Sequence, residues 1–170
     1  MGCASLTSLT IPASTTNIQD RTFNGCSRLM QFSVAADNPA YKSVSGLLLT
    51  NDGKTLVAGI NGNVTIPDSV INTTAFAFLQ YTNLSSLTVP DSVIDIKEYM
   101  CYGCNNLTSI VLGNSVASIE RYAFRNCSNL TSIVIPNSTI DIGDHAFSYC
   151  SNLANVTIPD STASIVNYAF

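Results

Sequence analysis

The stretch that decides the fold is CSNLTSIVIPNSTIDIGDHAF, residues 127–147, because a closely similar stretch, CSNLANVTIPDSTASIVNYAF, follows at residues 150–170. Self-similarity at a fixed period of this length is the signature of a repeat protein. The first position of the repeat occurs at Cys3, Cys26, Tyr81, Cys104, Cys127 and Cys150. Neighbours in this series are 23 residues apart, except that Cys26 and Tyr81 are separated by 55 residues. This longer interval holds two turns, one of which is nine residues longer than the other turns.

Three columns of apolar residues follow this first position in the repeat and predict a short strand. They are Leu6, Leu29, Leu84, Leu107, Leu130 and Leu153; then Leu9, Phe32, Leu87, Ile110, Ile133 and Val156; then Ile11, Val34, Val89, Leu112, Ile135 and Ile158. The pattern L-x-x-I-x-I places all three side chains on the inner face of the strand. Because one 23-residue unit cannot bury that face alone, the units must stack. Their strands then form a parallel sheet with a spacing of about 4.8 Å.

A turn and a second apolar segment complete each repeat. Proline follows the strand at Pro12, Pro67, Pro90, Pro136 and Pro159, and an Asp-Ser or Asn-Ser pair then favours a turn in most repeats. An isoleucine column comes next, at Ile18, Ile96, Ile119, Ile142 and Ile165, and an Ala-Phe pair ends the unit at Phe78, Phe124, Phe147 and Phe170. We expect the Ala-Phe segments to form short helical or 3₁₀ turns. The Phe and Leu columns should carry the stability, whereas Lys97 is expected to be exposed and unimportant for it.

The long gap between repeats contains a hairpin signal. GLLLT and KTLVAG flank the letters NDG, and Asp-Gly favours a β-hairpin because its backbone tolerates positive φ. The sequence therefore predicts a β-hairpin insert over residues 36–62, with a protruding tip at Asn51 to Lys54. The alternative is that this segment is a domain boundary or a disordered linker.

The recurring blocks C-S-N-L-T-S-I-x-I-P-x-S and I-x-x-x-A-F-x-x-C resemble the 23-residue leucine-rich repeats of the BspA-like family of bacterial and trichomonad surface proteins. The resemblance covers essentially all of residues 1–170, and DNPAYKSVSGLLLTNDGKTLV resembles the hairpin that interrupts many such arrays. It implies an α/β repeat solenoid, a right-handed superhelix with one parallel β-sheet and short helical or 3₁₀ turns on the other side. Because neither end carries a polar capping repeat, we expect residues 1–170 to be one solenoid domain within a longer array.

The composition argues against nucleic-acid and membrane partners. The net charge is −4 at pH 7, and the seven Lys and Arg are scattered singly, unlike a surface that binds polyanions. No apolar run approaches the roughly 18 residues that span a bilayer, so we expect no direct membrane insertion. The start MGCASLTSLTIP has neither the features of a secretory signal nor those of a lipidation site.

The cysteines and the single histidine could suggest a redox, metal-binding or catalytic site. Cys101-x-x-Cys104 has the spacing of a redox pair or of half a zinc site. However, Cys104 belongs to the cysteine column, Cys101 stands where Phe124 stands in its own repeat, and the chain has no second C-x-x-C. His145 occupies a column of aromatic rings and has no recurring acidic partner. We expect the cysteines to be reduced and mostly buried, and we expect no catalytic residue, metal or cofactor.

Two classes of function follow. The resemblance implies a non-catalytic protein-binding or adhesion module of a cell-surface or secreted protein, because BspA-like proteins are adhesins, and its partner would be a host, matrix or cell-surface protein. The alternative is a structural or intracellular scaffold segment without a ligand of its own.

Two candidate binding surfaces can be placed on the repeat. Side chains alternate across a strand, so the residues beside the middle inward position face outward. They are Ser86, Thr88, Ser109, Val111, Ser132, Val134, Asn155 and Thr157. The second candidate is the hairpin tip at Asn51, Asp52 and Lys54. The outward residues are small and lack the aromatic or arginine anchors of tight interfaces, so affinity per repeat should be weak. Small residues also suit a purely structural role in close strand stacking.

Overall fold

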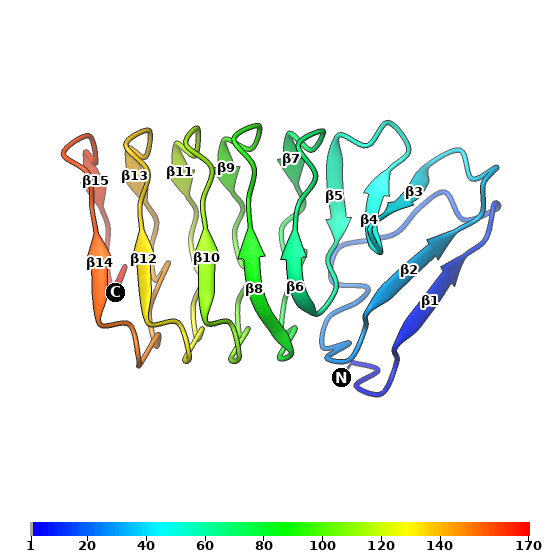
Figure 1. The fold of residues 1–170 in the computed structure, drawn as a ribbon, viewed down its shortest axis with the longest axis horizontal. Coiled ribbons are helices and arrows are strands. Elements are labelled where there is room, and N and C mark those ends of the chain that lie inside the picture. Colours follow the sequence, from blue (N-terminus) through cyan, green and yellow to red (C-terminus); the bar gives the residue numbers. More distant parts are fainter. Residues whose placement is uncertain (1) are drawn as a thin grey trace.

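One short strand per turn lines up along one side of an elongated solenoid of seven turns in the computed structural model, which describes residues 2–170 (Figure 1). These first-row strands are β1 (Ser8–Ile11), β2 (Gln31–Val34), β6 (Gly62–Thr65), β8 (Leu84–Thr88), β10 (Ser109–Val111), β12 (Ser132–Val134) and β14 (Asn155–Thr157). They pair in parallel as β1–β2, β6–β8–β10 and β12–β14. Ser109 lies opposite Ser86, one repeat earlier. The predicted stacking of turns in register is therefore confirmed.

A second row of parallel strands runs along the other side of the solenoid, where one sheet alone was expected. It consists of β7 (Asn72–Thr73), β9 (Asp95–Ile96), β11 (Ser118–Ile119), β13 (Asp141–Ile142) and β15 (Ser164–Ile165), of which β9 to β15 form one sheet. Ile119 lies opposite both Ile96 and Ile142. Stacking in register brings the backbone of the isoleucine column into pairing distance as well, so the prediction of a single parallel sheet was wrong.

The predicted apolar columns form one continuous core between the two rows. Leu29, Leu84, Leu107 and Leu130 are fully buried, as are Phe78 and Phe124. The Phe124 and Phe147 rings stack at 5.4 Å between centroids, and Phe147 stacks on Phe170 at the same distance. Each ring thus covers the face of its neighbour one turn away.

The Ala-Phe segments are not helical, and the expectation of helical or 3₁₀ turns was wrong: residues 2–170 contain no α- or 3₁₀-helix. Neighbouring N–H groups alternate in direction. The N–H of Leu79 donates to Phe76 O within the turn at 3.0 Å, whereas the N–H of Phe78 donates to Met100 O in the next turn at 2.8 Å. Left-handed backbone at Phe76 (φ 66°) and Gln80 (φ 59°) closes the segment at both ends. A helix needs consecutive internal bonds, and here half the donors serve the neighbouring turn.

The long gap holds three antiparallel strands, β3 (Tyr41–Val44), β4 (Leu47–Thr50) and β5 (Thr55–Ala58). The predicted hairpin is β4–β5, and β3 was missed. β5 also pairs in parallel with β7, so the insert continues the second row. Leu47, Leu48 and Leu49 are almost completely buried, and the tip between β4 and β5 stays level with the neighbouring turns in Figure 1. The insert is thus part of the core, and the expectation of a protruding tip was wrong.

Asn61 connects the turns on the two sides of the insert through hydrogen bonds of its side-chain amide. It occupies the leucine column, yet it is 1% exposed and hydrogen-bonded at both ends of its amide. Its Nδ2 donates to Cys26 O at 3.3 Å and to Leu29 O at 3.0 Å, and its Oδ1 accepts from the N–H of Asn83 at 3.1 Å. One side chain thus satisfies backbone groups of the turns on both sides of the insert.

Lys97 differs from its prediction. Its side chain is 31% exposed, and its Nζ lies 2.9 Å from Glu120 Oε1 and 3.2 Å from Asp95 Oδ2. Residues on adjacent second-row turns are therefore tied together by this side chain. Lys97 is not a neutral reference site, and the exposed Thr131 is a better one.

The aromatic column predicts a large loss of stability in Phe124→Ala. Truncation removes a fully buried ring and leaves a cavity between two turns, so the free energy of unfolding should fall by about 3 to 5 kcal/mol. Thr131→Ala should lower it by less than about 0.5 kcal/mol. Urea denaturation measures both, and indistinguishable midpoints would show that the column does not carry the core.

Asn61→Leu should destabilise the protein although leucine is the rule in that column. The substitution leaves the acceptors at Cys26 and Leu29 and the donor at Asn83 without this partner, which should lower the free energy of unfolding by at least about 2 kcal/mol. Asn61→Asp, which keeps the acceptor and loses the donor, is the matched comparison. A rise in the urea midpoint of Asn61→Leu would show that the column's apolar preference outweighs the hydrogen bonds.

Candidate protein-binding surfaces

The first-row strands hold the eight predicted outward side chains in two straight columns. Ser109 lies opposite Ser86 and Val111 opposite Thr88, while Ser132 lies opposite Asn155 and Val134 opposite Thr157. Ser86 and Thr88 are partly buried and the other six are exposed, with Val134 at 68%. The predicted outward orientation is confirmed. Whether these columns bind a partner is a separate matter.

A shallow groove interrupts this face. The first-row strands are hydrogen-bonded on each side of it, but the pairing is broken between β10 and β12. A volume of about 350 Å³ lies along the break, lined among others by Val111, Asn114, Val134 and Pro136. The apolar side chains of Val111 and Val134 are therefore presented beside a depression and not on a flat sheet.

The hairpin tip is a rigid turn. Asp52 Oδ1 accepts from Thr50 Oγ1 at 2.6 Å and from the N–H of Lys54 at 2.9 Å. These two bonds, helped by nearby lysine charge, lower the pKa of Asp52 below its usual value. The carboxylate is thus engaged inside the turn, while Asn51 and Lys54 are exposed.

The structure does not bring the two predicted surfaces together. β4 and β5 contact β2, β3 and β7 or one another, and they make no contact with β8, β10, β12 or β14 within residues 2–170. A single small partner could not use both surfaces at once. They are two alternatives.

A third surface, which the sequence had suggested only as packing, runs along the Ala-Phe turns. Aromatic rings stack there from turn to turn, and we call this set the aromatic row: Phe76, Tyr99, Tyr122, His145 and Tyr168. Centroids of successive rings lie 4.9 to 5.2 Å apart. His145 is therefore a stacking member between two tyrosines, as expected. The ring faces cover one another, so the edges of the row are what a partner would meet.

Arginines lie against the aromatic row. Arg125 has its guanidinium carbon 5.1 Å from the Tyr122 centroid, 4.8 Å from that of Tyr149 and 5.9 Å from that of Tyr102. Arg121 lies 4.8 Å from the same Tyr122 ring. The columns that supply these arginines hold other residue types in other repeats, so no recurring pattern in the sequence marked them.

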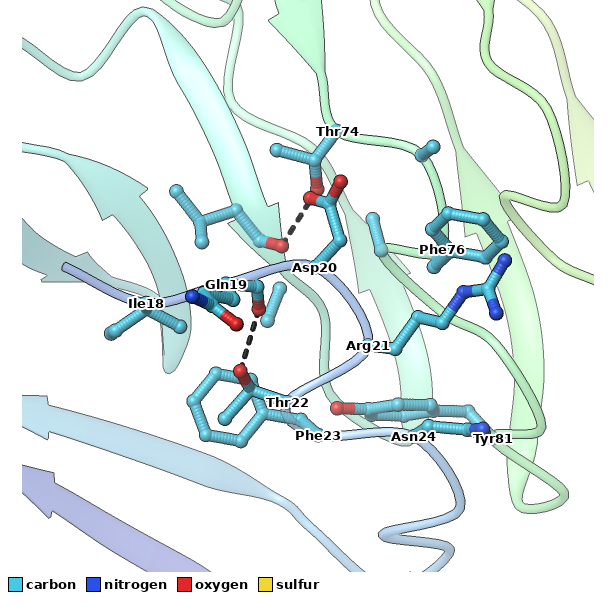
Figure 2. Close-up of a pocket in the computed structure, with 14 residues that line it drawn as sticks. Ile18, Gln19, Asp20, Arg21, Thr22, Phe23, Asn24, Thr74, Phe76 and Tyr81 are labelled. Carbon is cyan, nitrogen blue, oxygen red and sulfur yellow. Dashed lines mark hydrogen bonds between the residues drawn. The ribbon is translucent and has the colours of Figure 1, made fainter.

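Arg21 occupies the aromatic column itself near the insert and lies 4.2 Å over the Phe76 ring. Figure 2 shows the two side chains beside a cavity in which the hydroxyl of Tyr81 points toward the 18–24 segment. The cavity has a volume of about 30 Å³, enough for one water molecule. Burial, and secondarily Cys26 and Cys104, raises the pKa of Tyr81 well above its usual value. This space is too small for an organic ligand.

The cysteine column is a ladder of buried thiols. Sγ of Cys104, Cys127 and Cys150 donates to the carbonyl of the turn before it, at 3.0, 3.3 and 3.2 Å. Burial, and then the neighbouring Cys104, raises the pKa of Cys101, and the hydrogen bond to Cys150 together with burial raises that of Cys127. Cys101 and Cys127 are thus held protonated, which is the opposite of a reactive cysteine, whereas the hydrogen bond with Cys127 lowers the pKa of Cys150. Five of the six are buried, as predicted, and Cys3 is exposed.

Neither a metal cluster nor a membrane-spanning helix is found in the described chain. Within residues 2–170, no three His, Cys, Asp or Glu side chains converge on one point as metal ligands would. In the same range no helix has the length and apolar character to cross a bilayer.

The architecture defines a leucine-rich-repeat solenoid with exposed faces on both rows of strands. Residues 1–43 and 60–170 match the BspA type leucine rich repeat region in six copies, and the chain belongs to this family. The unmatched stretch falls within the insert. Among curated proteins none matches at a significant level.

Solved structures share the fold. The pneumococcal vaccine antigen PcpA superposes with a TM-score of 0.82 at 24% identity, over 92% of this chain and 40% of that one. A leucine-rich cell surface protein from Faecalibacterium prausnitzii gives 0.64 at 26% identity, over 89% and 48%. The T. pallidum leucine-rich repeat protein gives 0.63 at 28% identity, over 75% and 61%. The chain spans less than two thirds of each.

The thiol ladder predicts that all six cysteines are reduced and that five are protected. In denaturant without reductant, a thiol reagent should titrate six groups, whereas the folded protein should release one equivalent rapidly, from Cys3. Cys3→Ser should abolish the fast phase. A count below six in denaturant would mean that a disulfide forms within the column.

Proposed function

We propose that this chain is a non-catalytic protein-binding module of a cell-surface or secreted protein. The observation that carries the proposal is the register of the first row, which aligns outward side chains of successive turns over β8 and β10 and again over β12 and β14. Such a surface is long, rigid and accessible, and solenoid proteins use extended surfaces of this kind for binding. Family membership and a cell-surface protein among the structural neighbours support a surface location.

The partner we propose is a protein of the host, the matrix or another cell, bound through Ser109, Val111, Ser132 and Val134 around the groove. The groove accepts small apolar side chains, and the serines on its rim offer hydrogen bonds. No anchor residue of the kind that dominates tight interfaces is present in these columns. Each groove therefore contributes weakly, and useful attachment comes from several repeats acting together.

A double variant tests this surface. Ser109→Arg with Ser132→Arg places two large charges beside the groove and should reduce attachment of the full-length protein to its host surface by tenfold or more. Ser115→Arg with Ser151→Arg adds the same charge at exposed positions outside the sheet and should leave attachment unchanged. Asn51→Ala with Lys54→Ala tests the tip separately. Unaltered attachment by the first and third variants, with folding intact by circular dichroism, would remove both surfaces and favour a scaffold role.

A further inference from the structure

Arginine is concentrated on the aromatic row. The chain has four arginines, at positions 21, 28, 121 and 125, and all but Arg28 lie over an aromatic ring of this surface. The lysines take no part in these contacts. Together with tryptophan, tyrosine and arginine are the residues enriched among the energetically dominant side chains of protein interfaces. The predicted sheet columns lack both.

Arg125 is the centre of this group. Three tyrosine rings, Tyr102, Tyr122 and Tyr149, surround its partly buried guanidinium within 5.9 Å of their centroids. Tyr149 is 67% exposed, so the group lies at the surface. Stacking on rings uses the faces of the guanidinium plane and leaves its in-plane N–H donors free, in the fork geometry that matches a carboxylate.

These donors have no internal acid partner. Across residues 2–170, both ion pairs within 4.0 Å belong to Lys97, and none involves an arginine. Glu98 and Asp144 occupy the same column as Arg121, one repeat before and after it, so acidic residues flank Arg121 in its column. The column of Arg125 offers only Leu79, Tyr102 and Ser148 in the repeats around it. Its positive charge is thus the less compensated of the two.

We propose that Arg125, framed by Tyr102, Tyr122 and Tyr149, binds a glutamate or aspartate side chain of an acidic segment in a partner protein. The carboxylate takes two N–H donors of the guanidinium, and the tyrosine edges pack against the aliphatic part of the same segment. Stacking holds the guanidinium in place before binding, which reduces the side-chain entropy lost on association. The inference rests on the proposed protein-binding function but uses a different face of the solenoid.

The chemistry favours an acidic peptide over a polyanion such as a sulfated glycan. A polyanion needs an array of cations, and here one uncompensated arginine stands on a chain with a net charge of −4. A single fork surrounded by apolar ring edges suits one carboxylate with neighbouring apolar groups.

NMR titration of the whole chain tests the proposal with two matched peptides, acetyl-Gly-Glu-Leu-Glu-Gly-amide and its counterpart with Gln at both Glu positions. The Glu peptide should shift the ring signals of Tyr102, Tyr122 and Tyr149 and the Nε–H of Arg125, and the Gln peptide should not. Arg125→Gln should weaken binding at least about tenfold, and Arg125→Lys should weaken it less, because charge is kept while the fork is lost. Arg28→Gln, which removes an arginine away from the row, should bind as the parent does.

Several outcomes would overturn the proposal: no shift with the Glu peptide, equal shifts with the Gln peptide, or equal weakening by Arg28→Gln. Tighter, Arg125-dependent binding of a heparin octasaccharide would assign the site to sulfated glycans instead. Ser109→Arg with Ser132→Arg should bind the Glu peptide normally. If that variant lost attachment but bound the peptide normally, the sheet face alone would be the attachment surface. The two proposals can therefore fail independently of each other.

Discussion

Hydrogen bonding between turns is the constraint on which the rest of the structure depends. Turns are hydrogen-bonded to one another along the paired strands of the two rows and again at the Ala-Phe segments, where alternate N–H groups leave the turn to reach the next one. These bonds fix the register. Because of this register, Leu packs on Leu, Phe packs on Phe, and Cys104, Cys127 and Cys150 each lie next to a carbonyl of the preceding turn. If the Ala-Phe segment formed only internal hydrogen bonds, as a helix does, its bonds to the next turn would be lost.

The period of the sequence was sufficient to predict the apolar columns, the stacking and the outward side chains of the first row, because each depends on alternation or recurrence. The β4–β5 hairpin was predicted from its Asp-Gly turn instead. The second sheet and the absence of helix were not predictable in this way. Both depend on whether a backbone N–H bonds to a carbonyl in its own turn or in the next turn. Asn61 departs from the leucine column, but the column does not show which backbone groups its amide serves. The third strand lies in the insert, which has no column to compare with.

Candidate binding surfaces were harder to predict than the core, for a physical reason. Core positions repeat because each turn must bury the same face, whereas Arg121 and Arg125 occur once each in their columns and are identified only by the rings around them, from their own and neighbouring turns. Tyr122 receives both arginines on one ring, although they are four residues apart and belong to different columns. The sheet face is long and accessible, whereas the aromatic row is flanked by arginine side chains, so the two candidate surfaces differ in chemistry.

The break between β10 and β12 gives the solenoid an uneven mechanical strength. Tension along the long axis pulls successive turns apart perpendicular to their strands, so bonds between turns are loaded one group at a time and not all together. Between these two turns the second row still pairs β11 with β13, while the first row contributes no ladder. The first-row side of this junction is therefore weaker than its second-row side, so these two turns can separate at the groove while β11 and β13 stay paired.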